Sequence, residues 1–135
     1  MGLVLVDSNV LLDVLTEDNN WFDWSSRQLA HCAEENDLCI NQIIYAEISI
    51  GFDRIEDLES TLPKEYFSYL HVPYEAAFLA SKCFLTYRQA GGKRHSPLPD
   101  FFIGAHAAVE KMTLLSRDKG WYQTYFPGLQ IIAPD

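Results

Sequence analysis

Apolar and polar positions along the chain follow two different periods. Residues 3–6 form an unbroken apolar run, which is typical of a buried strand in a parallel sheet. Residues 74–90 instead place apolar side chains on one face of a helix, which Gly91 and Gly92 would end. Similar patterns predict further strands at 38–40, 69–72, 113–115 and 129–132, and further helices at 8–15, 21–35, 42–52, 54–62, 100–109 and 121–126. Because strands and helices alternate, we expect one α/β domain over residues 1–135, with a mostly parallel sheet covered on both faces.

The composition suits a folded globular protein and limits its partners. With 48% apolar residues, the 135-residue chain can bury a dense core. Ten basic and 19 acidic side chains give a net charge of −9, which argues against binding duplex nucleic acid through phosphate neutralisation alone. The same charge is compatible with a nucleic-acid enzyme whose acidic residues bind metal ions.

Cysteine usage and hydropathy indicate where the protein works. Cys32, Cys39 and Cys83 lack the spacing of a metal site and stand in apolar sequence. This pattern predicts buried, reduced thiols and therefore a cytoplasmic protein. Every apolar run is shorter than the roughly 18 residues that a membrane helix needs, so we expect no membrane association.

Four acidic residues lie where an apolar segment ends or a helix begins: Asp7, Glu47, Asp100 and Asp118. Asp7 and Asp118 follow predicted strands, and functional groups of parallel sheets gather beyond the carboxyl ends of the strands. Taken singly, Asp7 and Asp118 could each be a turn residue, and Asp100 could cap the helix that it precedes. Gathered together, the carboxylates would repel one another unless bound cations or raised pKa values offset the repulsion.

Glu47 is the most informative single acid, because the segment around it, residues 43–50, is apolar nearly all round. A glutamate is almost never fully buried without a partner, so Glu47 predicts either a metal ligand or an ion pair with a distant Arg or Lys. Oxygen ligands suit hard cations such as Mg²⁺ or Mn²⁺, and the scattered histidines give no zinc site. Asp13, further along the first helix, is expected to be solvated.

Four short motifs follow one another in an order known from one family. Residues 4–13 read VLVDSNVLLD, residues 44–47 read IYAE, residues 99–107 read PDFFIGAHA and residues 114–122 read LLSRDKGWY. In this order and spacing the chain resembles the PIN-domain ribonucleases, in particular the VapC-type toxins of bacterial and archaeal toxin–antitoxin modules. The resemblance spans nearly the whole chain. One mild departure is Gly104, which stands where the family commonly has Ala.

The resemblance implies a three-layer α/β/α fold with a central, mostly parallel sheet of about five strands, usually in a homodimer. It implies an endoribonuclease that uses Mg²⁺ or Mn²⁺ and leaves a 5′-phosphate. The catalytic and metal-binding set carried over to this chain is Asp7, Glu47, Asp100 and Asp118. Asn9 and Ser116 would give polar support. The implied partner is an antitoxin protein that places a basic residue against the acidic pocket.

The expected substrate is single-stranded or looped RNA, because unpaired bases can be read or stacked by side chains. Lys93 and Arg94 follow two glycines and are candidate contacts to the RNA backbone. The alternative for both is ordinary solvated charge in a loop.

Two other functions stay open at this point. A PIN-like module could bind RNA or protein without cleaving, and it would then have no need of a metal-binding acidic cluster. An aspartyl phosphatase also begins with a strand that ends in Asp, but it needs a second Asp two residues later, where this chain has Asn9.

Overall fold

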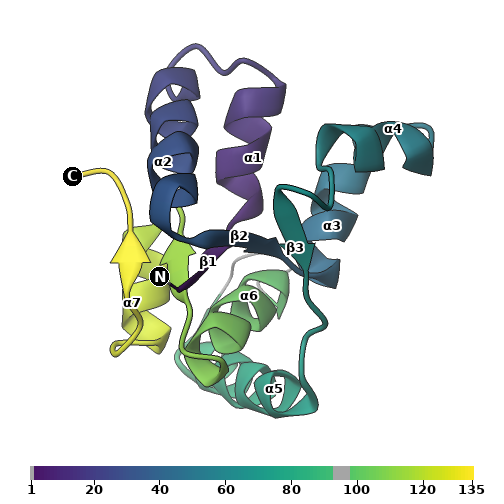
Figure 1. The fold of residues 1–135 in the computed structure, drawn as a ribbon. Coiled ribbons are helices and arrows are strands. Elements are labelled where there is room, and N and C mark those ends of the chain that lie inside the picture. Colours follow the sequence, from purple (N-terminus) through teal and green to yellow (C-terminus); the bar gives the residue numbers. More distant parts are fainter. Residues whose placement is uncertain (1, 93–97) are drawn as a thin grey trace.

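The computed structural model describes residues 2–92 and 98–135, in which strands and helices alternate along the chain (Figure 1). The strands are β1 Leu3–Val6, β2 Asp37–Ile40, β3 Phe67–Tyr69, β4 Thr113–Leu115 and β5 Ile131–Ile132. The helices are α1 Ser8–Leu15, α2 Phe22–Glu35, α3 Gln42–Ser49, α4 Ile55–Thr61, α5 Tyr74–Gln89, α6 Leu98–Val109 and α7 Lys119–Tyr125. Within these ranges, no helix is both long and apolar enough to cross a membrane.

The five strands form one parallel sheet in the order β3-β2-β1-β4-β5. Helices α1 and α2 lie on one side of the sheet and α5 and α6 on the other, so the molecule has three layers (Figure 1). The predicted three-layer α/β/α fold with a central sheet of about five strands is therefore confirmed. The first strand is the central one, and all five carboxyl ends meet at one edge.

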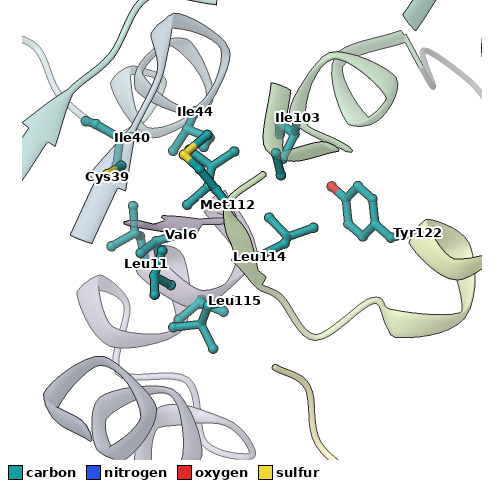
Figure 2. Close-up of a cluster of buried hydrophobic side chains, with 14 of the residues drawn as sticks. Val6, Leu11, Cys39, Ile40, Ile44, Ile103, Met112, Leu114, Leu115 and Tyr122 are labelled. Carbon is teal, nitrogen blue, oxygen red and sulfur yellow. The ribbon is translucent and has the colours of Figure 1, made fainter. Parts of the chain in front are cut away.

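The core lies between the sheet and the helices on its two faces. Strand β1 is buried from Val4 to Val6, as its unbroken apolar run predicts for a central parallel strand. Figure 2 shows Leu114 and Leu115 of β4 in the same cluster, together with side chains from α1, α3 and α6. Tyr122 of α7 also enters this cluster, with its hydroxyl group pointing inward (Figure 2).

Several element boundaries differ from the sequence prediction by one or two residues, and β3 and α3 differ most. Strand β3 covers residues 67–69 rather than 69–72, because the Val72 amide donates to the Gln42 side chain instead of to a neighbouring strand. Helix α3 ends at Ser49 rather than near residue 52. There Gly51 and Phe52 turn back with hydrogen bonds to Ile48 and Ser49, which replace the helical pattern.

Candidate active site

Asp7 lies at the carboxyl end of the central strand and is 4% exposed. It is the N-cap of α1, and its Oδ1 accepts the Ser8 amide at 2.8 Å. Its Oδ2 accepts the Ser116 hydroxyl at 2.7 Å and the Tyr122 hydroxyl at 3.0 Å. Burial raises the pKa of Asp7 from 3.8 to about 6, although these hydrogen bonds partly oppose the shift. Among the described residues, its partners are all uncharged donors.

Glu47 projects from α3 toward the same strand end. The Ser8 hydroxyl donates to Glu47 Oε1 at 2.8 Å, so Ser8 joins the two acids, with its amide on Asp7 and its hydroxyl on Glu47. The charge of Glu47 contributes to the raised pKa of Asp7, which shows that the two carboxylates act on each other. The side chain is partly rather than fully buried, and no Lys or Arg pairs with it within residues 2–92 and 98–135.

Asp100 and Asp118 come from α6 and from the start of α7, and both are partly buried. Asp118 occupies the N-cap position of α7, but its side chain does not cap the helix. Asp100 lies in the first turn of α6 rather than capping it, since that helix begins at Leu98. Burial raises the pKa of the Tyr122 hydroxyl, and the charges of Asp7, Asp100 and Asp118 raise it further. The Tyr122 hydroxyl is thus close enough to all three carboxylates for each of them to raise its pKa.

Ser116 and Asn9 connect these acids. Ser116 is fully buried, donates to Asp7 and accepts the Asp118 amide at 3.0 Å. The Asn9 amide group lies 3.4 Å from Ser116 Oγ and 3.5 Å from Asp7 Oδ2. Both residues thus contact the acidic site as neutral polar groups.

The donor set is suited to some metal sites and not to others. Within the described part of the chain, no three carboxylate, imidazole or thiol groups are close enough to enclose a cation on their own. Mg²⁺ is usually bound through one or two carboxylates, with waters and substrate phosphates completing its shell. Asp7 and Glu47, joined through Ser8, fit that second pattern, and their oxygen ligands suit Mg²⁺ or Mn²⁺ rather than zinc.

Sequence reasoning missed two features of the site. Tyr122 is 1% exposed and bonds to Asp7, yet nothing in an aromatic helix indicates which hydroxyl will face an acid 115 residues earlier. Asp13 was expected to be solvated and is instead 3% exposed. Arg117 holds it through two hydrogen bonds of 2.8 and 3.1 Å. The shared face of α1 that carries Asn9 and Asp13 was the available signal for this second acid.

The candidate RNA contacts and one buried histidine remain to be placed relative to the structure. Lys93 and Arg94 lie outside the described residues. His106 is buried and lies 3.0 Å from Asn41 Nδ2 through its Nδ1. Because Asn41 Oδ1 already accepts the Ile44 amide, its Nδ2 donates to the imidazole, and His106 takes a structural role beneath the carboxyl edge of the sheet.

Several solved structures share this fold. VapBC2 from Rickettsia felis, bound to a DNA fragment from its promoter, is 19% identical with a TM-score of 0.74, covering 98% of this chain and 99% of that chain. VapBC-1 from nontypeable Haemophilus influenzae is 18% identical with a TM-score of 0.73, covering 97% of each. FitAcB from Neisseria gonorrhoeae is 20% identical with a TM-score of 0.71, again covering 97% of each.

The sequence matches a family model but no individual curated protein. The family model of the PIN domain matches residues 4–127, a span that runs from the central strand through the last helix and contains all four acids. On that match, the chain belongs to the PIN domain family.

Proposed function

We propose that this protein is a metal-dependent endoribonuclease whose ligand and catalytic set is Asp7, Glu47, Asp100 and Asp118. The observation that carries the proposal is the state of Asp7. Its carboxylate is buried at the centre of the sheet edge, its described partners are uncharged donors, and burial together with the charge of Glu47 raises its pKa. Such a site would be stabilised by a cation, and the described residues supply none to Asp7.

The residues of the site divide into ligands and supports. Ser116 and Tyr122 donate to Asp7 Oδ2, whereas Oδ1 accepts the Ser8 amide and, among the described contacts, nothing else. A lone pair of Oδ1 is therefore available to a cation on the side where Ser8 also holds Glu47. Bound there, Mg²⁺ or Mn²⁺ would lower the pKa of a water and balance the charge of a phosphate. Asn9 and Ser116 keep the carboxylate in position as neutral supports.

The proposed substrate is single-stranded RNA or an RNA loop. A net charge of −9 disfavours a broad duplex-binding surface, whereas a short flexible strand needs few phosphate contacts. Lys93 and Arg94 remain the proposed backbone contacts of this strand.

The proposed partner is an antitoxin, which would make this protein the toxin of a toxin–antitoxin pair. The neighbouring structures include VapBC and FitAB assemblies and a toxin–antitoxin complex from Klebsiella pneumoniae. The elements that carry Asp7 and Glu47 also bear exposed apolar side chains: Leu12 and Leu15 on α1, and Ile50, which is 88% exposed, just after α3. A helix docked on these residues could direct a basic side chain toward Asp7 and Glu47.

The remaining parts of the proposal concern organisation and location. We propose that residues 1–135 act as one nuclease domain, that the protein is a homodimer and that it works in the cytoplasm. The exposed apolar side chains of Tyr74, Phe78 and Leu85 on α5 are spaced to share one helix face, on the opposite side of the sheet from α1. That face is available for a second copy while the α1 side binds an antitoxin.

The test is cleavage of end-labelled single-stranded RNA by the purified protein with Mn²⁺ or Mg²⁺, beside the variants Asp7→Asn and Glu47→Gln. Glu59→Gln is the matched control, since Glu59 is also partly buried and accepts a hydroxyl hydrogen bond, from Tyr45, but lies on α4. We expect cleavage in the wild type and in Glu59→Gln, loss by at least about 100-fold in the two site variants, and no cleavage in chelator.

Two results would contradict the proposal. Full metal-dependent cleavage by Asp7→Asn would exclude Asp7 as a ligand. A wild-type protein that neither cleaves RNA nor binds Mn²⁺ in calorimetry would favour the non-catalytic module. Cleavage absent with Mn²⁺ binding intact would instead direct the search to the sequence of the RNA.

A further inference from the structure

Beside the acidic site lies a second polar cluster, formed by Asp13, Ser25, Trp21 and Arg117. Arg117 makes a bidentate ion pair with Asp13, with Nε 2.8 Å from Oδ2 and Nη2 3.1 Å from Oδ1. Ser25, fully buried, donates its hydroxyl to Asp13 Oδ2 at 2.7 Å. The guanidinium group also lies 4.9 Å from the centre of the Trp21 ring. The arginine side chain is thus held by a carboxylate and an aromatic face, the two partners that suit its planar group best.

The same helix also holds the backbone of Arg117. The Arg117 amide donates to Asn9 Oδ1 at 3.3 Å, and Asn9 and Asp13 stand one helical turn apart on α1. Helix α1 therefore contacts this one residue at two points, through its backbone and through its charge. No other residue of the segment between β4 and α7 is fixed to α1 in this double way among the described contacts.

Arg117 lies in the sequence between two residues of the acidic site, so its contacts with α1 bear on that site. Its neighbours are Ser116, which orients Asp7, and Asp118, a proposed ligand. Residues 116–118 connect β4 to α7. The Ser116 amide still donates to the Ile132 carbonyl of β5, and the Asp118 carbonyl accepts the Tyr122 amide of α7. Among the described contacts, the Arg117 amide between them is held by the Asn9 side chain instead. Fixing Arg117 on α1 also fixes the two residues that flank it relative to Asp7, which begins the same helix.

We propose that Asp13 and Arg117 are positioning residues for the cation site, because their ion pair holds the Ser116–Asp118 segment against α1. The inference rests on the proposed function, since it assigns a role relative to the same site. It also assigns Arg117 away from the RNA, since one edge of its guanidinium group pairs with Asp13 and the group lies over the Trp21 ring. The side chain is 30% exposed, which leaves RNA contact as the alternative to be tested.

The test measures Mn²⁺ binding by calorimetry and RNA cleavage for Arg117→Gln, Arg117→Lys, Asp13→Asn and the double variant Asp13→Asn with Arg117→Gln. Arg54→Gln is the control, because Arg54 pairs with Glu56 at 3.5 Å in an exposed ion pair on α4. Circular dichroism and urea titration establish that each protein is folded under the binding conditions, so the affinities refer to folded molecules. The two Arg117 variants keep the test usable where Asp13→Asn fails to fold.

We expect each single variant to raise the Kd for Mn²⁺ by about 10–100-fold, the usual effect of removing a group that supports metal ligands. The double variant should be no weaker than the worse single one, because both changes break the same attachment. Arg117→Lys keeps the charge but not the bidentate geometry, so it should lose Mn²⁺ affinity as well. Arg54→Gln should match the wild type.

Three outcomes would overturn the inference, and they are distinguishable. Wild-type Mn²⁺ affinity in all Arg117 variants, with binding lost in Asp7→Asn, would remove the positioning role and leave the proposed function standing. Normal Mn²⁺ affinity with a raised KM for RNA in Arg117→Gln, and a normal KM in Arg117→Lys, would make Arg117 an RNA contact instead. Unchanged Mn²⁺ binding and cleavage in Asp7→Asn would remove the proposed function and this inference with it.

Discussion

Helix α1 carries two buried aspartates whose charges are handled in opposite ways. Asp7 at its N-terminus is 4% exposed and Asp13 in its second turn is 3% exposed, so burial alone does not distinguish them. Asp13 receives a guanidinium group from Arg117 and a hydroxyl from Ser25. Asp7 receives an amide and two hydroxyls but, among the described residues, no positive charge.

The two aspartates differ in whether the described residues compensate their negative charge. Burying a carboxylate is unfavourable unless its charge is compensated, and the chain compensates Asp13 internally. At Asp7 the chain adds negative charge instead, because the nearby Glu47 also raises the pKa of Asp7. Asp13 is thus paired within the protein and has a structural role. Asp7 has no such counter-charge among the described residues, which agrees with its proposed role as a cation ligand.

The largest expected effect comes from breaking the Asp13–Arg117 ion pair. Asp13→Asn keeps the shape of the side chain but leaves Arg117 without its counter-charge, and we expect the free energy of unfolding to fall by about 2–3 kcal/mol. This is below the usual cost for a fully buried pair, because Arg117 is partly exposed. Urea denaturation in chelator measures the change, with Arg54→Gln expected to change stability by less than about 0.5 kcal/mol. If Asp13→Asn lost no more stability than Arg54→Gln, the Asp13–Arg117 pair would contribute no more than an exposed surface ion pair.

The next effect concerns Asp7 and has a defined dependence on pH. Its pKa in the folded, metal-free protein is about 6 against an ordinary value of 3.8, so between these values the folded protein retains a proton that the unfolded chain releases. The contribution of Asp7 therefore lowers the free energy of unfolding as pH rises from about 4 to 6, by roughly 1–3 kcal/mol, and is constant above.

Asp7→Asn removes this titration, so the variant should lack that part of the pH dependence and be at least as stable as the wild type at pH 7 without metal. Urea titrations of both proteins in chelator between pH 4 and pH 8 test this. Equal slopes in the two proteins would mean that the Asp7 charge is already balanced within the chain. The contrast between the two aspartates of α1 would then disappear.

The smallest effect is expected from Tyr122→Phe, which removes one of the two hydroxyls on Asp7 Oδ2 and leaves the ring in the core. Above pH 6, where Asp7 is ionised, the variant should lose about 1–2 kcal/mol of stability, because hydrogen bonds to a charged acceptor contribute about that much. Below pH 4 the loss should shrink. Stability measured at pH 8 and pH 4 separates this from a packing defect, which would be equal at both.

Patterns that depend on nearby residues were enough to predict the frame of the molecule. The run at residues 3–6 identified the central strand, and the acids after strands identified the edge where Asp7 and Asp118 lie. The short edge strand β3 was misplaced, because a side chain, Gln42, rather than a strand takes the Val72 amide. Local apolar pattern cannot show such a replacement.

Contacts between distant segments could not be predicted from spacing. Asp13 looked like a solvated helix residue because its partner, Arg117, stands 104 residues later. Gly104 looked like a mild departure, yet a Cβ there would lie 2.3 Å from the Phe126 ring, which packs directly on α6. In both cases the deciding group comes from the last part of the chain and meets an earlier helix only after folding.

The position of β1 at the centre of the sheet has a consequence for synthesis. Asp7 leaves the ribosome well before Ser116 and Tyr122, which orient its carboxylate and follow 109 and 115 residues later. Contacts of such long sequence separation form late and slowly, because the chain loses the conformational entropy of closing a large loop before the contact contributes any favourable free energy. Asp7 and Glu47 are therefore synthesised long before their final geometry forms. A nascent chain interrupted before α7 carries both proposed ligands without Tyr122, which helps to orient Asp7.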